Sequence, residues 1–355
     1  MRYPTVALIA HTLESPGGQS VQARALAEGL RREGYDVVFV STNPRFPTPL
    51  RGLHRYPGAR TILTQALYLP SLLSLRRVDV VHIFSASYWA FLLAPVPAIL
   101  AARGLGKRIV LHYHSGEAED HLTRWGKLVH PWLRLAHEVV VPSEYLRRVF
   151  ARHGYRTRVI TNVVDVARYR YRERVPLRPR LLSTRNLEPH YRVEDTLEAF
   201  ALVRARYPEA TLTVAGSGSE EQRLRQLSAS LGCGGISFAG RVAPAAMAGL
   251  YDEADIFVNA SVVDNQPVSV LEAFAAGLAV VSTAPGDVAA MLDDGDGGHI
   301  VPQADPAAQA KAVMTLLENP DRALRMARHA RRVAERYTWP HVREAWARAY
   351  AGQVA

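Results

Sequence analysis

The stretch from Asp264 to Gly277, with the sequence DNQPVSVLEAFAAG, carries the residue types best suited to chemistry. Pro267 suits the first turn of a helix and Gly277 its C-terminal stop, which predicts a helix with free amides at its start. Those amides and the helix dipole favour an anion such as phosphate. Asp264 precedes the helix and Glu272 lies about two turns inside it, where carboxylates suit hydroxyl groups rather than a metal. An acidic helix cap with an ordinary surface glutamate is the alternative that the spacing alone leaves open.

A second set of polar residues follows the apolar stretch 108–113. Residues two apart in a strand project to the same side, so His112 and His114 are expected on one face. With their acidic neighbours they allow a metal site as one alternative and a purely structural role for His114 as another. The residues concerned are His112, His114, Glu117, Asp120 and His121.

Glycines mark two other places where a ligand could reach the backbone. Gly17 and Gly18 stand between an apolar stretch and a helical pattern, where missing side chains expose backbone amides to an anion. By itself, a Gly-Gly pair in such a place is more often only a turn. Gly216 and Gly218 lack the third glycine of a dinucleotide fingerprint, and the sequence has no Gly-x-x-x-x-Gly-Lys loop.

These residues fall between short apolar stretches that alternate with helical patterns. Continuous apolar strands separated by helices imply parallel sheets that are covered on both faces. In the first half, the expected strands are 6–10, 36–40, 78–84, 108–113, 138–142 and 159–160, with a helix over 21–32. In the second half, the expected strands are 180–183, 211–215, 236–239, 255–259 and 279–282. The expected helices there are 193–207, 220–231, 244–253, 268–276 and a final helical stretch from 306 with a break near 337–340.

The Arg-rich stretch 168–180 interrupts this alternation and divides the chain. Two repeating halves joined by a linker predict an α/β protein with two doubly wound, Rossmann-like domains that face a central cleft. The expected N-terminal domain covers residues 1–168, the linker 169–180 and the C-terminal domain 181–339. A C-terminal helix over about 340–355 is expected to pack back on the N-terminal domain.

Composition narrows the class of protein. Apolar residues make up 48% and charged residues 21% of the chain, as in folded soluble proteins. The single cysteine, Cys233, excludes an intrachain disulfide and a cysteine-based metal cage. The longest apolar stretch, 89–102, contains two prolines and is about 14 residues long, whereas a spanning helix needs about 20. With no signal-peptide pattern, we expect a cytoplasmic protein that is at most bound to the inner membrane face.

The net charge of +10 is unevenly distributed. Residues 1–168 hold 22 Arg and Lys against 11 Asp and Glu, whereas the remainder holds 21 against 22. The N-terminal half therefore carries the whole excess and is expected to meet something anionic. The charge alone suggests nucleic acid, but no reader motif accompanies it and the cations form no stripe. No nucleic-acid partner is therefore expected.

The stretch that starts at Asp264 resembles the carboxylate-x7-carboxylate motif of glycosyltransferase family 4, retaining enzymes of the GT-B fold, with Asp264 where Glu is usual. Four other pieces occur in the family's order along nearly the whole chain, and their order and spacing are more specific than any piece alone. They are Pro16-Gly17-Gly18 (glycine loop), Ile160 to Asp165 (end-of-first-domain signature), Ala215 to Gly218 (Gly-x-Gly loop) and Ala254 to Val258 (Ala-Asp strand).

The resemblance implies transfer of a sugar from a nucleoside diphosphate sugar to an acceptor hydroxyl, with retention at the anomeric carbon. Glu272 would then hold the ribose hydroxyls, and Asp264 or the amides after it the sugar hydroxyls. Arg185 corresponds to the family's arginine that neutralises the diphosphate. His114 corresponds to its active-site histidine beside the donor sugar.

One position departs from the family. The Lys expected five residues after Arg185 is His190, so His190 and Arg192 are two alternatives for the second cation of the phosphate clamp. The family usually works without metal, so no metal and no cofactor are expected. The remaining expected donor contacts are Gly17, Gly18, Gly216, Asn265, Gln266, Pro267, Val268 and Ser269.

The acceptor is the least determined partner. Similar enzymes often use lipid-linked acceptors, so the charge asymmetry fits a lipid-linked, cell-envelope or other anionic acceptor. Residues 67–77 and 122–134 combine apolar and basic side chains and suit an anionic membrane surface, with core packing of their leucines as the alternative. A GT-B-like sugar-nucleotide epimerase, a phosphorylase and a non-catalytic nucleotide-sugar binder are the other functions considered.

Overall fold

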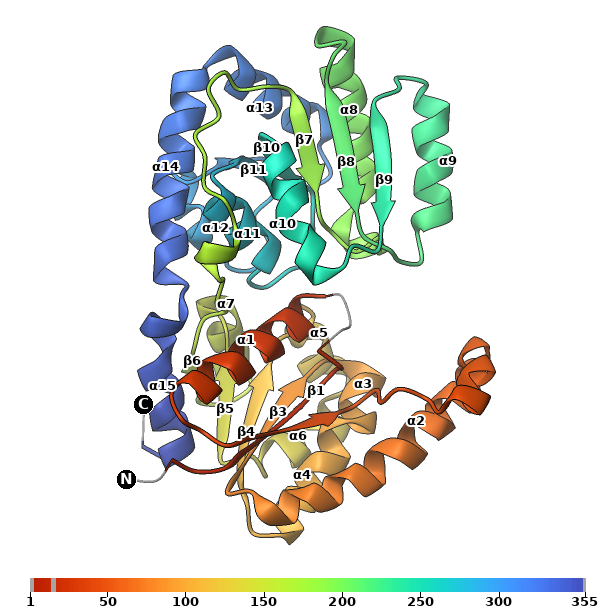
Figure 1. Ribbon diagram of the computed structural model, residues 1–355, viewed down its shortest axis with the longest axis vertical. Helices are drawn as coiled ribbons and strands as arrows, with labels where there is room; N and C mark the ends of the chain where they lie inside the picture. Colours follow the sequence, from red (N-terminus) through yellow and green to blue (C-terminus); the bar gives the residue numbers. More distant parts are fainter. Residues whose placement is uncertain (1–2, 14–16, 354–355) are drawn as a thin grey trace. The chain divides into compact units, whose positions relative to one another are not determined.

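The computed structural model describes residues 3–13 and 17–353, which form two compact α/β units (Figure 1). The first unit comprises the chain up to Thr161 together with the C-terminal segment from Val342. The second unit runs from Asn162 to His341, so the expected linker 169–180 belongs to it. Each unit contains one six-stranded parallel sheet, which agrees with the predicted fold class.

The first sheet has the strand order β2-β1-β3-β4-β5-β6, and all its pairs are parallel. Its strands are β1 (Val6–Ala10), β2 (Val37–Ser41), β3 (Val80–Ser85), β4 (Arg108–Tyr113), β5 (Glu138–Val141) and β6 (Arg158–Val159). The helices of this unit are α1 (Gly18–Arg32), α2 (Pro57–Ser71), α3 (Tyr88–Leu93), α4 (Pro95–Gly104), α5 (Ala118–Arg124), α6 (Gly126–Leu133), α7 (Glu144–Arg152) and most of α15 (Trp339–Ala351). All six strands lie within two residues of their predicted bounds.

The second sheet has the order β12-β11-β10-β7-β8-β9 and is also parallel. Its strands are β7 (Arg180–Ser183), β8 (Thr211–Ala215), β9 (Ile236–Gly240), β10 (Ile256–Asn259), β11 (Ala279–Ser282) and β12 (His299–Ile300). Its helices are α8 (Val193–Arg206), α9 (Glu221–Leu231), α10 (Pro244–Glu253), α11 (Val268–Ala276), α12 (Val288–Met291), α13 (Pro306–Glu318) and α14 (Pro320–Arg336). Sequence reasoning missed the two-residue strand β12, which follows Gly297 and Gly298, although it found β6, which is equally short.

Alternate residues of the second sheet belong to two different cores. Leu181 and Val281 contribute to the core on one face, and Leu182 and Val280 to the core on the other. This follows from the two-residue period of a strand, and it explains why the strands are apolar at every position. Helix α11 is almost wholly apolar because it is packed between the sheet and α14.

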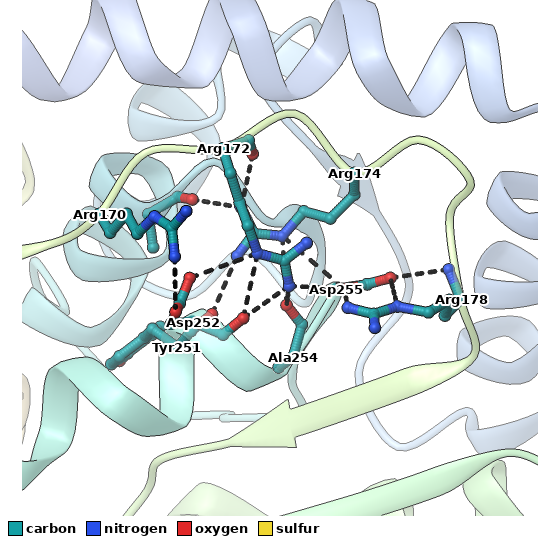
Figure 2. A network of polar contacts seen from close by, with 9 residues as sticks. Arg170, Arg172, Arg174, Arg178, Tyr251, Asp252, Ala254 and Asp255 are labelled. Atoms are coloured by element: carbon teal, nitrogen blue, oxygen red, sulfur yellow. Dashed lines mark hydrogen bonds and ion pairs between the residues drawn. The ribbon is translucent and has the colours of Figure 1, made fainter.

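Residues 170–178 form an arginine strap that is fixed to the second unit. Figure 2 shows Arg172, Arg174 and Arg178 converging on the carboxylate of Asp255, which is 0% exposed. Arg178 donates to Asp255 from its backbone amide at 2.8 Å and from its guanidinium at 2.9 Å. Arg174 is itself buried and donates to backbone carbonyls at the C-terminal ends of α10 and α11. The Arg-rich stretch is therefore an ordered part of the unit, because its cations are paired.

Among residues 3–13 and 17–353, none of the helices combines the length and apolarity that crossing a bilayer would require.

Candidate functional site

Helix α11 presents its N-terminus beyond the carboxyl end of β10. Pro267 occupies the N-cap position and Gly277 ends the helix with φ +77°, so the predicted helix 268–276 is confirmed. The first amides of the helix, at Val268 and Ser269, have no carbonyl partner four residues earlier within it. They and the helix dipole leave an anion-accepting end at the edge of the sheet where doubly wound folds bind ligands.

Arg185 lies against this helix end. It follows β7, is only 8% exposed, and donates through Nη1 to Ser269 Oγ at 2.9 Å. Its guanidinium forms an ion pair with Asp264 and lies 4.1 Å from the centre of the Tyr191 ring. Burial alone would lower the pKa of Arg185, but the Asp264 carboxylate outweighs burial and raises it, so the cation is retained. Its buried Nε has no hydrogen-bond partner among the described residues, which leaves one donor for a ligand.

Glu272 is held by two tyrosine hydroxyls. Tyr169 donates to Oε1 at 2.6 Å, and Tyr251 donates to Oε2 at 2.8 Å. Burial raises the pKa of Glu272, and the two tyrosine hydrogen bonds oppose that rise. A carboxylate has about four lone-pair sites, so two remain for hydroxyl groups of a ligand.

Neither tyrosine was identified from the sequence. Tyr169 follows the first-domain signature and Tyr251 lies on α10, at no spacing from Glu272 that would mark them. Thr184, adjacent to Arg185, shares a hydrogen bond of 2.8 Å with the Tyr251 hydroxyl. The cation and the carboxylate are therefore linked through one chain of contacts.

Replacing Tyr169 or Tyr251 with Phe is expected to move the acid limb of nucleotide binding to higher pH. Each substitution removes a hydrogen bond that favours the ionised form of Glu272, so its pKa rises further and the carboxylate is lost earlier as the pH falls. Nucleotide affinity measured by calorimetry from pH 8 to pH 5 checks this. Tyr207→Phe, on the C-terminal side of α8, is the control, and an unchanged acid limb in both variants would contradict the expectation.

The loop before α11 is fixed from two sides. Asn162 donates from its backbone amide to Gln266 Oε1 at 2.6 Å and from its side chain to Gln266 O at 2.8 Å. A Cβ on Gly286 would lie 2.5 Å from the carbonyl oxygen of Asp264, so only glycine allows this approach. Gln266 thus helps to hold the loop in place through its hydrogen bonds with Asn162. Asn265 is buried to a similar extent. The signature around Asn162 orients the loop that carries Asp264.

The Gly-x-Gly loop acts through packing. A Cβ on Gly216 would lie 2.1 Å from the carbonyl oxygen of Arg185, and a Cβ on Gly218 would lie 2.2 Å from that of Leu187. Any larger residue would push the loop of Arg185 away. The two glycines therefore support the position of Arg185.

The two alternatives for the second cation differ in their surroundings. Arg192 binds Asp195 through Nε at 2.6 Å and Nη2 at 2.7 Å, and it lies 3.8 Å from Glu194. Its fork is therefore occupied at the start of its own helix. His190 is half-buried with its ring 4.2 Å from the Tyr191 ring, the same ring that lies under Arg185. His190 therefore contacts the surroundings of Arg185, whereas Arg192 is bound to Asp195.

His114 lies in the first unit, directly after β4. Its amide donates to Ser85 O at 3.3 Å, and its ring stacks on Phe84 with a centroid distance of 5.2 Å. Burial lowers its pKa to about 3, so the imidazole is neutral near pH 7. Beside it, His112 Nδ1 lies 3.2 Å from His82 Nε2, and His82 Nδ1 lies 2.9 Å from the Tyr350 hydroxyl.

Two of the residues that the sequence suggested as metal ligands, His121 and Asp120, form other hydrogen bonds, and a third, Glu117, is exposed. His121 bonds the Tyr113 hydroxyl at 2.7 Å, and Asp120 accepts from Tyr88 at 2.7 Å. In the part of the chain that the structure describes, no three His, Cys, Asp or Glu side chains are grouped so that they could hold a metal ion.

The glycine loop also lies in the first unit. Gly17 caps α1 with φ +131°, which favours glycine, and Gly18 is the first residue of the helix. Pro16 lies outside the described residues. The structure thus brings Arg185, Asp264, Ser269 and Glu272 together in the second unit, while Gly17, Gly18 and His114 belong to the first.

Comparison with protein families finds two matches. Residues 16–168 match the family described as Glycosyltransferase Family 4, and residues 171–333 match Glycosyl transferases group 1. A phosphatidyl-myo-inositol mannosyltransferase of Mycolicibacterium smegmatis is 27% identical over 350 residues, which cover 93% of this chain and 88% of that protein. A glycogen synthase of Mycobacterium tuberculosis is 29% identical over 299 residues, covering 77% and 69%.

Solved structures show the same fold. HepE of Anabaena in complex with UDP and glucose has a TM-score of 0.76 at 18% identity, covering 98% of this chain and all of that one. The sucrose-phosphate synthase of Thermosynechococcus elongatus has a TM-score of 0.76 at 18% identity, covering 98% of both chains. At this identity the similarity shows the fold alone.

Proposed function

The chain belongs to the group 1 glycosyltransferases of family 4, and on that basis we propose how it binds its donor and what it does with the sugar. As a member of the family, it is an enzyme that transfers a sugar from a nucleotide sugar. The proposal rests on the connected set of Arg185, the α11 N-terminus and Glu272. The Nε atom of Arg185 has no hydrogen-bond partner among the described residues and can donate to a ligand.

In the proposed complex, Arg185 and the first amides of α11 bind the diphosphate. Glu272 accepts hydrogen bonds from the ribose hydroxyls, and Asp264 or the amides after it bind the sugar hydroxyls. We propose His190 as the second donor of the clamp, because its ring contacts the Tyr191 ring that lies under Arg185. We propose that this clamp binds the diphosphate without a metal, through the buried Arg185 cation and the α11 amides.

The proposed reaction retains the configuration of the anomeric carbon. The bond from that carbon to the leaving phosphate oxygen breaks, and the acceptor oxygen bonds to the same face. The leaving phosphate oxygen takes the acceptor's proton, while Arg185 and the helix amides stabilise the departing charge. His114, neutral at pH 7, is proposed to line the donor sugar as a hydrogen-bonding group rather than as a charge.

The first experiment is a thermal-shift screen against UDP, GDP, ADP and their sugars. We expect one base to raise the unfolding midpoint by several degrees, because a ligand that binds only the folded state stabilises it. Glu272→Gln should abolish the shift, whereas Glu318→Gln, an exposed acid at the end of α13, should retain it. No shift with any nucleotide would contradict the donor site. Transfer to an acceptor, with the anomeric configuration read by NMR, then tests retention.

For the acceptor, we propose a lipid-linked or cell-envelope molecule reached from the cytoplasmic membrane face. One relative is named for mannosyl transfer to phosphatidyl-myo-inositol. In residues 67–77, Leu72 and Leu75 belong to the core, but Leu69 and Leu73 are exposed at 47% and 61%, and Arg76 and Arg77 follow them. Exposed leucines beside arginines suit the surface of an anionic bilayer.

The double substitution Leu69→Ser/Leu73→Ser is expected to weaken binding to phosphatidylglycerol vesicles by about tenfold, because two apolar contacts are lost. Cosedimentation with such vesicles, against vesicles of phosphatidylcholine alone, measures the effect. Leu202→Ser, at a leucine of similar exposure in the second unit, should bind like the unmodified protein. Equal binding of all three proteins would remove residues 67–77 from the proposed membrane contact.

A further inference from the structure

An aromatic corner with one exposed indole and two half-buried rings follows β3 and β4 in the first unit. We use the term aromatic corner for Tyr88, Trp89 and Trp125. The rings of Trp89 and Trp125 are nearly perpendicular, at 88° with centroids 5.3 Å apart, and Tyr88 meets Trp125 at 71° and 5.6 Å. The Trp89 side chain is 66% exposed, although its ring packs against that of Trp125. A large exposed indole of this kind is typical of a binding surface.

Backbone strain orients the corner. Tyr88, the first residue of α3, has φ +55°, a conformation that is rare for a bulky side chain. Such outliers persist only where surrounding contacts hold them, and they cluster at functional sites. Here the Tyr88 hydroxyl donates to Asp120 Oδ2 at 2.7 Å, which ties α3 to α5. This contact holds Tyr88 in its unusual conformation, next to the backbone that carries Trp89.

A buried hydrogen-bond chain supports the corner from below. Ser87 Oγ lies 2.9 Å from the Tyr113 hydroxyl, and that hydroxyl lies 2.7 Å from His121 Nδ1. The His121 ring in turn meets the Tyr88 ring edge-on at 5.2 Å. Burial lowers the pKa of His121 to about 4, so the chain is uncharged near pH 7. The corner is thus held by the contacts among its own rings and by the hydrogen-bond chain beneath them.

The rim of the corner is polar, and most of its charged side chains are ion-paired. Asp120 Oδ1 forms an ion pair of 2.8 Å with Arg124 Nε, and both side chains remain accessible. Glu117 is exposed, whereas Glu119 forms an ion pair with Arg152 and lies 3.5 Å from His153 Nε2. Paired carboxylates and guanidinium groups can exchange hydrogen bonds with hydroxyls, but because their charges balance they offer little net attraction to an anionic lipid surface or a polyanion.

We propose that the aromatic corner binds a neutral pyranose ring of the acceptor, an inference that rests on the proposed glycosyltransferase function. A pyranose has an apolar C–H face that suits the Trp89 indole and hydroxyls that suit Asp120 and Arg124. Small-molecule sites commonly combine aromatic walls with a few polar groups in this way. The corner follows the carboxyl ends of β3 and β4, the sheet edge that also carries His114.

The test uses saturation-transfer NMR with the methyl α-pyranosides of glucose, mannose and galactose and with maltotriose. At least one of these should bind the full chain, and Trp89→Ala should weaken that binding tenfold or more. Trp89→Phe keeps an aromatic face and should stay within about threefold of the unmodified protein, since stacking tolerates a change of ring. Tyr56→Ala, at another exposed aromatic residue of the first unit, should bind normally.

Two outcomes would overturn the proposal. One is that no pyranoside binds, and the other is that Trp89→Ala binds as well as the unmodified protein. In the first case, loss of phosphatidylglycerol-vesicle binding in Trp89→Ala would identify the corner as a membrane anchor instead. The nucleotide thermal shift, measured on the same variants, should be unchanged in Trp89→Ala. If the unmodified protein shows no nucleotide thermal shift, that result counts against the donor site but does not bear on saccharide binding by the corner.

Discussion

Replacing Arg185 with alanine is expected to lower kcat/KM for sugar transfer by about 100- to 1000-fold, the usual effect of removing one group that stabilises charge in a transition state. Arg185 is buried, charged and bonded to Ser269 at the α11 N-terminus, and its Nε has no protein partner among the described residues. Arg185→Lys keeps the charge but loses the planar fork, so it should recover only part of the activity. Initial rates at several donor concentrations separate binding from chemistry.

Two control variants make this result interpretable. Arg185→Ala leaves Asp264 without its ion-pair partner, so the double substitution Arg185→Ala/Asp264→Asn shows whether that unpaired acid causes the loss. Arg192→Ala should stay within a few-fold of the unmodified enzyme, because the Arg192 fork is occupied by Asp195. A loss in Arg192→Ala as large as that in Arg185→Ala would show that Arg192 supplies the second cation. Near-normal activity of Arg185→Ala would refute the clamp.

Replacing Asp255 with alanine is expected to destabilise the second unit by about 3–5 kcal/mol, the effect of breaking a buried ion pair and leaving a charge unpaired. Asp255 is fully buried, and Arg174, which is also buried, would lose its nearest carboxylate at 4.0 Å. Burial opposes ionisation of Asp255, but hydrogen bonds from Arg178 and Arg172 outweigh it and hold its pKa below the usual range. The midpoint of thermal unfolding of this unit should fall by about 6–20 °C.

The matched control is Asp252→Ala. Asp252 contacts the same strap through Arg172 at 3.3 Å, but its side chain is 37% exposed. Exposed ion pairs contribute little, so this variant should lose less than about 1 kcal/mol. If both substitutions lower the free energy of unfolding equally, burial of Asp255 does not account for the stability that the network contributes. Because the chain has two units, the transition of the second unit must be followed separately.

The strap and the donor site are connected through the chain. Tyr169, which holds Glu272, immediately precedes the strap, and Tyr251, which holds the other oxygen, supplies a carbonyl to Arg174. The strap therefore adjoins Tyr169 along the chain and contacts the backbone of Tyr251. The Asp255 substitution should weaken nucleotide binding as well as stability, although no nucleotide contact is proposed for Asp255.

The fold was predictable to a large extent because its signals are local. An apolar run of five residues, such as Val6–Ala10, predicts a buried strand wherever it stands, and Pro267 with Gly277 predicts both ends of α11. The helix start was found in the same way, whereas Asp264 and Glu272 were singled out as site residues by the resemblance to glycosyltransferase family 4. The two-residue strand β12 was missed, although β6, of the same length, was predicted.

What the sequence determined was the order of strands and helices, the family and the identity of Arg185, Asp264 and Glu272 as candidates. Tertiary structure decided their partners. Tyr169 and Tyr251 meet Glu272 from 103 and 21 positions away, and the Gly-x-Gly loop supports Arg185 through backbone approach. Hydrogen bonds between such distant residues depend on how whole elements pack, and packing has no signature in local spacing. Secondary structure needs only neighbours along the chain, whereas a site is made by residues that folding brings together.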